Sequence, residues 1–341
     1  MGMFEFNDVG IDLGTSSVLV YVKNKGIVLR EPSVVAVEKI TGKIYAVGEE
    51  ARRMLGRTPG NIVAIRPLRD GVISNFDITE RLLRHFLKKV VGTRIFFKPR
   101  VVVCVPSGVT EVEKRAVEDV TLEAGAQSVA LIEEPMAAAV GSGLRIEDAR
   151  GSMIVDIGGG TTEVAVVSLG GIVVSHSLRV AGDELDEDIV NYVKREMNLA
   201  IGETTAEQIK IQIGCAMPLM TKMSMEVRGR DLSNGLPRNI IITSSQIEEA
   251  MQESIKKIVE VIKITLEKTP PELASDIMEK GIYLAGGGAL IKNLDKLVNK
   301  ETGMPVYIAE EPLECVVRGT GKTVEDLERL KSVLINARKR R

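Results

Sequence analysis

The feature that most constrains the fold is a motif that occurs twice in the chain. In each copy an apolar strand ends in an aspartate, and glycine and hydroxyl residues follow at once. The copies are Asp12-Leu13-Gly14-Thr15-Ser16-Ser17 and Asp156-Ile157-Gly158-Gly159-Gly160-Thr161-Thr162. A repeated supersecondary unit in a chain of 341 residues predicts two related domains that face one another.

The residues around each copy predict mixed α/β domains. Alternating apolar residues predict a meander of antiparallel strands at 9–13, 17–22, 26–29 and 33–38, and three more strands within 153–178. Buried strands are expected at 100–106 and 128–135. Helical periodicity predicts helices at 77–91, 183–197, 205–213 and 246–268, and one directly after Thr110. The expected capping boxes pair Thr110 with Glu113, Thr204 with Glu207, and Ser245 with Glu248.

Glycine-rich turns of this kind suit phosphate groups. Without side chains in the way, backbone N–H groups turn toward one point and, with nearby hydroxyls, surround phosphate oxygens. Two such turns on facing domains would hold one polyphosphate from both sides, and a third turn follows at Ala285-Gly286-Gly287-Gly288-Ala289-Leu290. The alternative is that each turn is an ordinary hairpin turn.

The aspartate before each of the first two turns indicates a metal ion. A carboxylate beside phosphate is unfavourable unless a cation lies between them, so Asp12 and Asp156 are predicted to hold Mg²⁺ through its water molecules. Two other phosphate-binding motifs are excluded by counting. A P-loop would need glycine at Val316, and the dinucleotide-binding fingerprint would need glycine at Glu163 or Ile291.

Composition excludes several classes of protein. The 45 basic and 47 acidic residues leave a net charge of −2, which argues against a nucleic-acid binder held mainly by phosphate contacts. Cys104, Cys215 and Cys315 lie far apart, so neither a disulfide framework nor a zinc site is expected, and a reducing cytoplasm fits. No apolar run approaches the roughly 20 residues that span a bilayer.

Several stretches resemble one family. They include GIDLGTSSVLVYVKNKGIVLREPSVVAV, LIEEPMAAAVG, VDIGGGTTEVAVVSLGGIV, AGDELDEDIV, TAEQIKIQIG and LAGGGAL. The chain resembles the superfamily of actins, sugar kinases and heat-shock chaperone ATPases, and within it the MreB-type bacterial actins. The resemblance implies an α/β, actin-like ATPase fold, with two related domains around a nucleotide cleft. Each domain would contain a five-stranded mixed sheet, helices and a small subdomain.

The resemblance also implies a division into four subdomains. Subdomain IA is expected at 1–32, 67–145 and 312–341, and subdomain IB at 33–66. Subdomain IIA is expected at 146–181 and 246–311, and subdomain IIB at 182–245. One departure from the family is Ser16-Ser17, where Ala-Asn is usual, and these hydroxyls still suit phosphate.

The same resemblance implies roles for individual residues. Glu134 would hold the attacking water, Thr161 would contact the γ-phosphate and Asp156 would act with them. The nucleoside would be lined by Glu207, Gln208, Ile209 and Lys210, and the adenine and α-phosphate by Gly287, Gly288, Ala289 and Leu290. From the residues alone, the alternatives are that Glu134 is a solvated acid at a strand end and that Glu207 and Lys210 are an ordinary surface pair three residues apart.

Aromatic residues are few, and four of the six phenylalanines cluster at two places. Phe4 and Phe6 lie at the N-terminus, and Ile95, Phe96 and Phe97 lie between two cations. Burial of the second group in lipid would stabilise by roughly 1.5–3 kcal/mol for each side chain. The alternative is that they pack on their own domain. The family resemblance favours a membrane loop, and Phe76 and Phe86 are assigned to the core.

The resemblance implies an ATP-binding and slowly hydrolysing protein with Mg²⁺ as its second cofactor. It would polymerise into filaments of paired protofilaments on the inner face of the cytoplasmic membrane, organise cell-wall elongation and maintain rod shape. Its partners would be other copies of the chain and elongation proteins of the MreC, MreD and RodZ types, with no nucleic acid. The alternative function is a small-molecule kinase of the sugar-kinase type, which would need an acid aimed at an acceptor hydroxyl.

Overall fold

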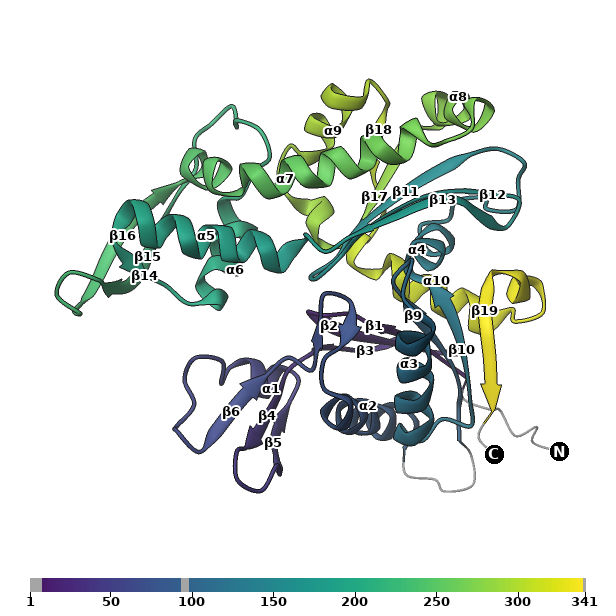
Figure 1. The fold of residues 1–341 in the computed structure, drawn as a ribbon, viewed down its shortest axis with the longest axis horizontal. Coiled ribbons are helices and arrows are strands. Elements are labelled where there is room, and N and C mark those ends of the chain that lie inside the picture. The colour runs from purple at the N-terminus through teal and green to yellow at the C-terminus, as the bar shows by residue number, and fades with distance from the viewer. Residues whose placement is uncertain (1–7, 93–97, 340–341) are drawn as a thin grey trace.

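The computed structural model describes residues 8–92 and 98–339 and contains a large β-sheet in each half of the chain (Figure 1). The first sheet has the strand order β19-β10-β9-β1-β2-β3. Its strands are β1 (Val9–Leu13), β2 (Ser17–Val22), β3 (Gly26–Pro32), β9 (Arg100–Val105), β10 (Ser128–Glu133) and β19 (Leu334–Lys339). The first three form the predicted antiparallel meander, whereas β9 and β10 run parallel to β1.

Two expectations about this sheet were wrong. The segment predicted as a fourth meander strand forms β4 (Val35–Glu38), which pairs with β5 (Ile44–Val47) and β6 (Ile62–Ile65) in a separate small sheet next to α1 (Glu49–Arg52). The chain leaves the first sheet at Pro32, which has no N–H to continue the ladder. The sheet also has six strands and not five, because the basic C-terminal segment forms β19 and pairs with β10.

Helices cover both faces of the first sheet. α2 (Phe76–Val91) and α3 (Glu111–Ala124) pack on one face, and α4 (Glu134–Gly141) and α10 (Cys315–Glu325) pack on the other. Along β9, Val101 and Val103 join the core with α2 and α3, whereas Val102 and Cys104 join the core with α4 and α10. A strand buried on both faces carries apolar residues at consecutive positions, which explains the run RVVVCV.

The second sheet repeats this arrangement with the order β13-β12-β11-β17-β18. Its strands are β11 (Ser152–Ile157), β12 (Thr162–Ser168), β13 (Gly171–Leu178), β17 (Ile282–Ala285) and β18 (Val306–Ile308). One face packs on α5 (Gly182–Met197), α6 (Glu203–Ile213) and α7 (Ser244–Glu267). The other face contributes Ile154, Ala165 and Val167 to the core of α4 and α10. These two helices therefore lie between the two sheets (Figure 1).

The two central helices approach each other closely because small residues face one another. A Cβ built on Gly141 would lie 1.7 Å from the carbonyl oxygen of Cys315, and one on Gly319 would lie 1.9 Å from that of Ala137. Since no side chain fits at such distances, glycine is required at both positions.

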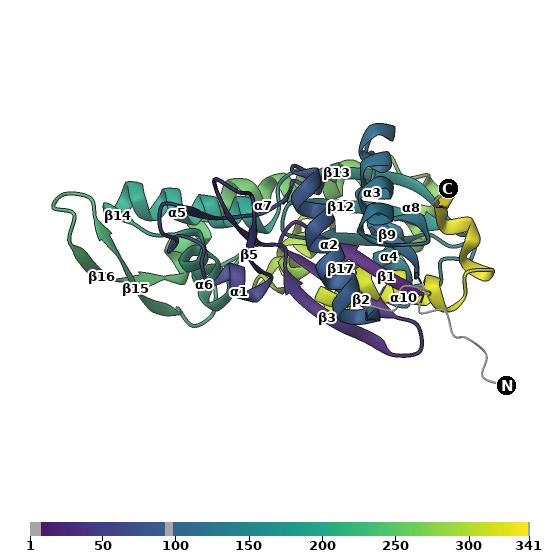
Figure 2. The same ribbon diagram turned by 90° about the horizontal axis from the view of Figure 1, so that it is seen from below.

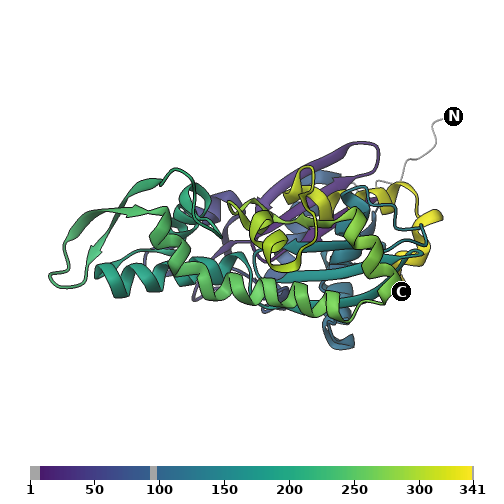
Figure 3. The ribbon, with the colours of Figure 1, turned by 90° about the horizontal axis from the view of Figure 1, so that it is seen from above.

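The remaining elements extend the second half. A three-stranded sheet at the end of the molecule far from the termini contains β14 (Leu199–Ala200), β15 (Ser224–Asp231) and β16 (Pro237–Thr243) (Figure 2). α7 runs along the length of this half (Figure 3). The other short elements are β7 (Leu68–Arg69), β8 (Val72–Ile73), α8 (Pro271–Lys280), η1 (Gly287–Leu290), α9 (Leu294–Thr302), η2 (Pro312–Glu314) and η3 (Arg329–Val333).

Helix starts were predicted with mixed success. The capping box of Thr110 with Glu113 is confirmed. α7 begins two residues earlier than expected, with Thr243 and Gln246 as its capping box, and α6 begins at Glu203 without a side-chain cap. Phe86 is buried and Phe76 packs against the same core, as predicted. Among the described residues, no helix is long and apolar enough to cross a membrane.

Candidate functional site

The two repeated motifs form equivalent hairpin turns, one in each half. The N–H of Gly14 donates to the carbonyl oxygen of Ser17 at 3.1 Å in the β1–β2 turn, and the N–H of Gly158 donates to that of Thr161 at 2.9 Å in the β11–β12 turn. Both predicted turns are thus hairpin turns, which is the alternative raised above.

The positions of the turns relative to each other are more informative. A Cβ on Gly159 would lie 2.1 Å from the Ser16 Oγ, and one on Gly160 would lie 2.6 Å from the Thr15 Oγ1. The turns therefore face each other across the junction of the two halves, and glycines on one side meet hydroxyls on the other. Glycine-rich turns and hydroxyls gathered at one place suit the binding of an anion.

One carboxylate lies directly before each turn, and Asp156 is buried whereas Asp12 is half-buried. Burial raises the pKa of Asp12 to about 6, and burial followed by the charge of Asp12 raises that of Asp156 to about 8. Around Asp12 the described neighbours offer only a weak partner, the Cys104 thiol, which donates to Oδ1 at 3.4 Å. Carboxylates that repel each other suit a divalent cation, so the pair fits Mg²⁺. The described residues contain no group of three or more such ligands, so water or phosphate would complete the coordination.

Glu134 lies at the same junction. It is the first residue of α4 and is buried, so the alternative of a solvated acid at a strand end is wrong. Burial, followed by the charges of Glu163, Asp12 and Asp156, raises its pKa well above the usual value, while a hydrogen bond from Thr161 acts in the opposite direction. The preceding Glu133 ends β10 in a different environment, near Lys114.

The third glycine-rich turn lies against the second. Gly286 has a φ of 77°, and a Cβ there would lie 2.6 Å from the Oδ1 of Asp156. A Cβ on Gly288 would lie 2.2 Å from the Ile157 Cγ2. The residues that follow Gly286 form η1, in which Gly288 and Ala289 are buried and Leu290 is half-exposed.

The four predicted nucleoside residues on α6 differ in their surroundings. Lys210 donates from Nζ to the carbonyl oxygen of Gly182 at 2.6 Å and pairs with Asp186 at 2.8 Å. Glu207 pairs with Arg52 of the other half at 3.4 Å, so the surface-pair alternative for Glu207 with Lys210 is wrong. Gln208 is exposed. The side chain of Ile209 is fully buried in the core, which leaves only its backbone to line a nucleoside.

Some residues of the site were not predicted. Asp183, at the start of α5, accepts from the Ser16 Oγ at 3.2 Å and from Arg66 Nη1 at 3.1 Å. Its N–H donates to the carbonyl oxygen of Gly159 at 2.8 Å. Asp183 therefore links the two turns with the small sheet of the first half. The acidic start of the helical run AGDELDEDIV is the signal that could have drawn attention to it.

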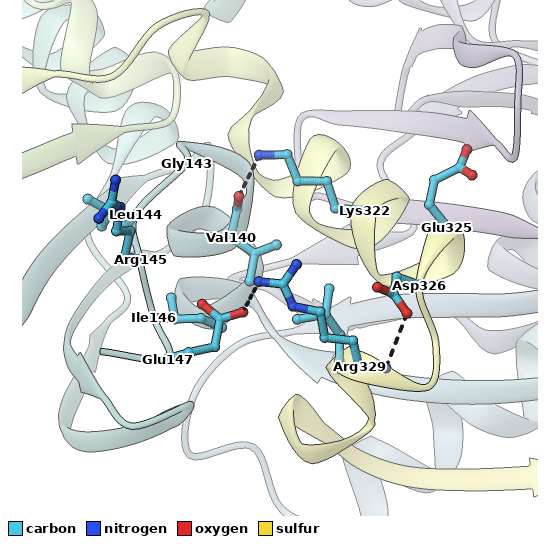
Figure 4. A pocket seen from close by; sticks show the side chains of 11 residues that line it. Val140, Gly143, Leu144, Arg145, Ile146, Glu147, Lys322, Glu325, Asp326 and Arg329 are labelled. Atoms are coloured by element: carbon cyan, nitrogen blue, oxygen red, sulfur yellow. Dashed lines mark hydrogen bonds and ion pairs between the residues drawn. The ribbon is translucent and has the colours of Figure 1, made fainter. Parts of the chain in front are cut away.

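A cavity of about 400 Å³ lies elsewhere, beside α4, α10 and η3 (Figure 4). Lys322 donates to the carbonyl oxygen of Val140 at 2.8 Å, and Arg329 pairs with Glu147 at 2.8 Å, both on its wall. None of the residues of the three glycine-rich turns lines it. The cavity is therefore separate from the three glycine-rich turns and from Asp12, Asp156 and Glu134.

Comparison with known proteins agrees with this geometry. The sequence profile described as MreB/Mbl protein matches residues 6–332. The chain belongs to the MreB/Mbl family. It is 54% identical over 332 residues to the cell shape-determining protein MreB of Escherichia coli K12, covering 96% of this chain and 95% of that protein. It is 51% identical over 323 residues to the cell shape-determining protein Mbl of Bacillus subtilis, covering 95% and 97%.

Solved structures share the fold of this chain. The crystal structure of MreB5 of Spiroplasma citri bound to AMPPNP matches with a TM-score of 0.90 at 41% identity, over 94% of this chain and 96% of that one. The double helical filament of MamK matches with a TM-score of 0.79 at 24% identity, over 94% and 99%. The expected actin-like α/β fold is therefore confirmed.

Proposed function

We propose that this MreB/Mbl chain binds ATP with Mg²⁺ between its two halves. The observation that carries the proposal is the pair of facing turns, with the buried Asp156 beside one and the half-buried Asp12 beside the other. The cation would offset the negative charge of Asp12, Asp156 and the nucleotide phosphates, and the phosphate oxygens would accept from N–H groups and hydroxyls of the turns. The MreB5 structures, bound to AMPPNP in one case and to ADP in the other, support this ligand.

We also propose the residue roles that the family resemblance implies. Glu134 would orient the attacking water and Thr161, to which it is hydrogen-bonded, would face the γ-phosphate. Lys210 lies close enough to the second turn to contact the nucleoside, because its partner Gly182 donates to the Gly158 carbonyl oxygen at 3.1 Å. When bound, Mg²⁺ would take up charge that develops on the transferred phosphoryl group.

The division into subdomains IA, IB, IIA and IIB is proposed with the boundaries given above. The small sheet β5-β4-β6 fits subdomain IB, and the sheet β14-β15-β16 fits subdomain IIB. The return of α10 and β19 to the first half fits the assignment of 312–341 to subdomain IA.

The cellular role we propose is that of a bacterial actin. The chain would polymerise with ATP into paired protofilaments on the inner face of the cytoplasmic membrane and organise cell-wall elongation with MreC, MreD and RodZ-type partners. The names of its relatives, which describe cell shape-determining proteins, support this role. Hydrolysis would be slow and coupled to assembly.

Sedimentation tests the proposal. The chain is mixed with liposomes and with ATP, ADP or ATP plus excess chelator, and the pelleted fraction and released phosphate are measured. We expect liposome-bound polymer that depends on ATP and Mg²⁺. A chain that stays monomeric with every nucleotide and lipid overturns the filament proposal. ADP formation that rises on addition of a sugar, without matching release of phosphate, would support the kinase alternative.

The membrane contact is proposed for Phe4, Phe6, Ile95, Phe96 and Phe97, which lie outside the described residues. Changing Ile95, Phe96 and Phe97 together to serine should release polymer from liposomes and leave ATP binding unchanged, because only apolar surface is removed. The assay is co-flotation with anionic liposomes, with nucleotide affinity as its control. Unchanged recovery in the lipid fraction counts against this loop.

A further inference from the structure

Glu163 is a buried acid for which the functions above give no role. It lies on β12 between Asp156 of β11 and Ser177 of β13, and its side chain is fully buried. Burial raises its pKa to about 7. Buried carboxylates are rare unless they are hydrogen-bonded, so its partners indicate what it does.

Those partners come from both halves of the chain. Oε2 accepts from the backbone N–H of Ser107 at 3.0 Å, and Ser107 lies in the loop after β9 of the first half. Oε1 accepts from the Ser177 Oγ at 2.5 Å within the second half. The carboxylate therefore joins the first half to the second through Ser107.

This contact is close to the proposed hydrolytic residues. Apart from burial, Glu163 is the strongest of the acids that raise the pKa of Glu134, ahead of Asp12 and Asp156. Thr161, which is hydrogen-bonded to Glu134, lies two residues before Glu163, and alternate residues of an extended segment share one face. Glu134 and Thr161 belong to different halves, so their contact depends on the register between the halves.

We propose that Glu163 is a positioning residue for ATP hydrolysis, which holds the loop of Ser107 against β12 and thereby keeps Glu134 in register with Thr161. The inference rests on the proposed ATPase function. Glu163 itself touches neither nucleotide nor water in this mechanism. It acts through Glu134, and it couples the closure of the two halves to the hydrolytic step.

Three variants of the full chain test the proposal. Glu163→Leu removes the acceptor for the Ser107 N–H, Glu163→Gln keeps an oxygen acceptor of the same length, and Ser177→Ala removes only the partner within the second half. The measured quantities are the rate constant of phosphate release per pelleted polymer, and the Kd for ATP from displacement of a fluorescent analogue. Thermal unfolding checks that each variant is folded.

We expect the rate constant to fall at least tenfold in Glu163→Leu, with the Kd within threefold of wild type. Glu163→Gln should recover the rate to within about threefold, and Ser177→Ala should leave it unchanged. A purely structural role would lower stability without this split between rate and affinity. If the leucine variant does not fold, Glu163→Asp takes its place. The aspartate side chain is shorter by one methylene group, so its carboxylate should no longer reach the Ser107 N–H.

The outcomes separate the two proposals. A folded Glu163→Leu or Glu163→Asp chain that hydrolyses ATP at the wild-type rate overturns the role of Glu163 and leaves the ATPase proposal intact. An equal loss in Ser177→Ala also overturns it, since that variant keeps the contact between the halves. A wild-type chain that binds ATP and never releases phosphate overturns both.

Discussion

Replacement of Asp156 by asparagine should make the nucleotide-free chain more stable while it weakens ATP binding. In the unfolded chain this carboxyl ionises near the usual aspartate pKa of 3.8, whereas burial and the charge of Asp12 raise the folded pKa to about 8. Between pH 3.8 and about pH 8, the Asp156 carboxyl is ionised in the unfolded chain and protonated in the folded one. The free energy of unfolding therefore falls by about 1.4 kcal/mol for each pH unit in this window.

The magnitude follows from the width of the window. At pH 8 the accumulated loss for Asp156 reaches about 5 kcal/mol, and at pH 5 it is about 1.5 kcal/mol. The asparagine amide does not ionise, so the variant avoids this pH-dependent loss of stability. Burial of the amide itself costs part of the free energy that is gained. We expect Asp156→Asn to raise the free energy of unfolding by at least about 2 kcal/mol more at pH 8 than at pH 5.

Urea unfolding with EDTA and without nucleotide, at pH 5 and pH 8, measures this difference. Glu187→Gln, at an exposed acid on α5, is the matched control and should change stability little at either pH. In the same preparations, affinity for ATP with Mg²⁺ should fall at least tenfold in Asp156→Asn. The reasoning is refuted if the variant is less stable than wild type at pH 8, or if its advantage is the same at both pH values.

Two further predictions concern one ion pair between the halves and the contact between α4 and α10. Arg66→Gln removes the ion pair between Arg66 and Asp183, whose side chains are 29% and 34% exposed. A pair this exposed is worth below about 1 kcal/mol, so nucleotide should dissociate about threefold faster from the variant in stopped-flow measurements. Arg69→Gln, at an 82% exposed side chain, is the control, and equal rates in both would contradict the role of the pair. Gly141→Ala should lower the free energy of unfolding by about 3 kcal/mol, because the added methyl group would overlap the Cys315 carbonyl oxygen. Urea unfolding measures this change, and an unchanged midpoint would show that α4 and α10 can move apart without cost.

Local chemistry made the glycine-rich turns predictable, because the residues that form each turn are adjacent in sequence. The same holds for the capping box of Thr110 with Glu113. At the start of α7, however, two overlapping pairs satisfy the same pattern, Thr243 with Gln246 and Ser245 with Glu248. β16 ends at Thr243, so the helix follows without a gap, and only the sheet decides between the pairs.

The contacts that the site residues make with distant parts of the chain could not be predicted from neighbouring residues in the sequence. Lys210 and Glu207 were placed correctly on one helix, yet their ionic partners, Asp186 and Arg52, come from other elements. Glu163 was missed because a glutamate in the run TTEVAVV has the pattern of a solvent-facing position in a half-buried strand. Burial on both faces of the second sheet reverses that interpretation, and only the assembled halves reveal it.

The position of α4 and α10 between the two sheets has a mechanical consequence. Their side chains belong to a single core that also includes residues of both sheets, so the halves share packed interior and are not joined by linkers alone. Close-packed interiors transmit strain instead of absorbing it. A pull or twist applied to one half by a neighbouring subunit or by a curved membrane would reach Glu134, at the first turn of α4, without passing through the nucleotide. In the proposed polymer, tension would then act on the proposed hydrolytic site, and filament curvature would set the lifetime of the bound nucleotide.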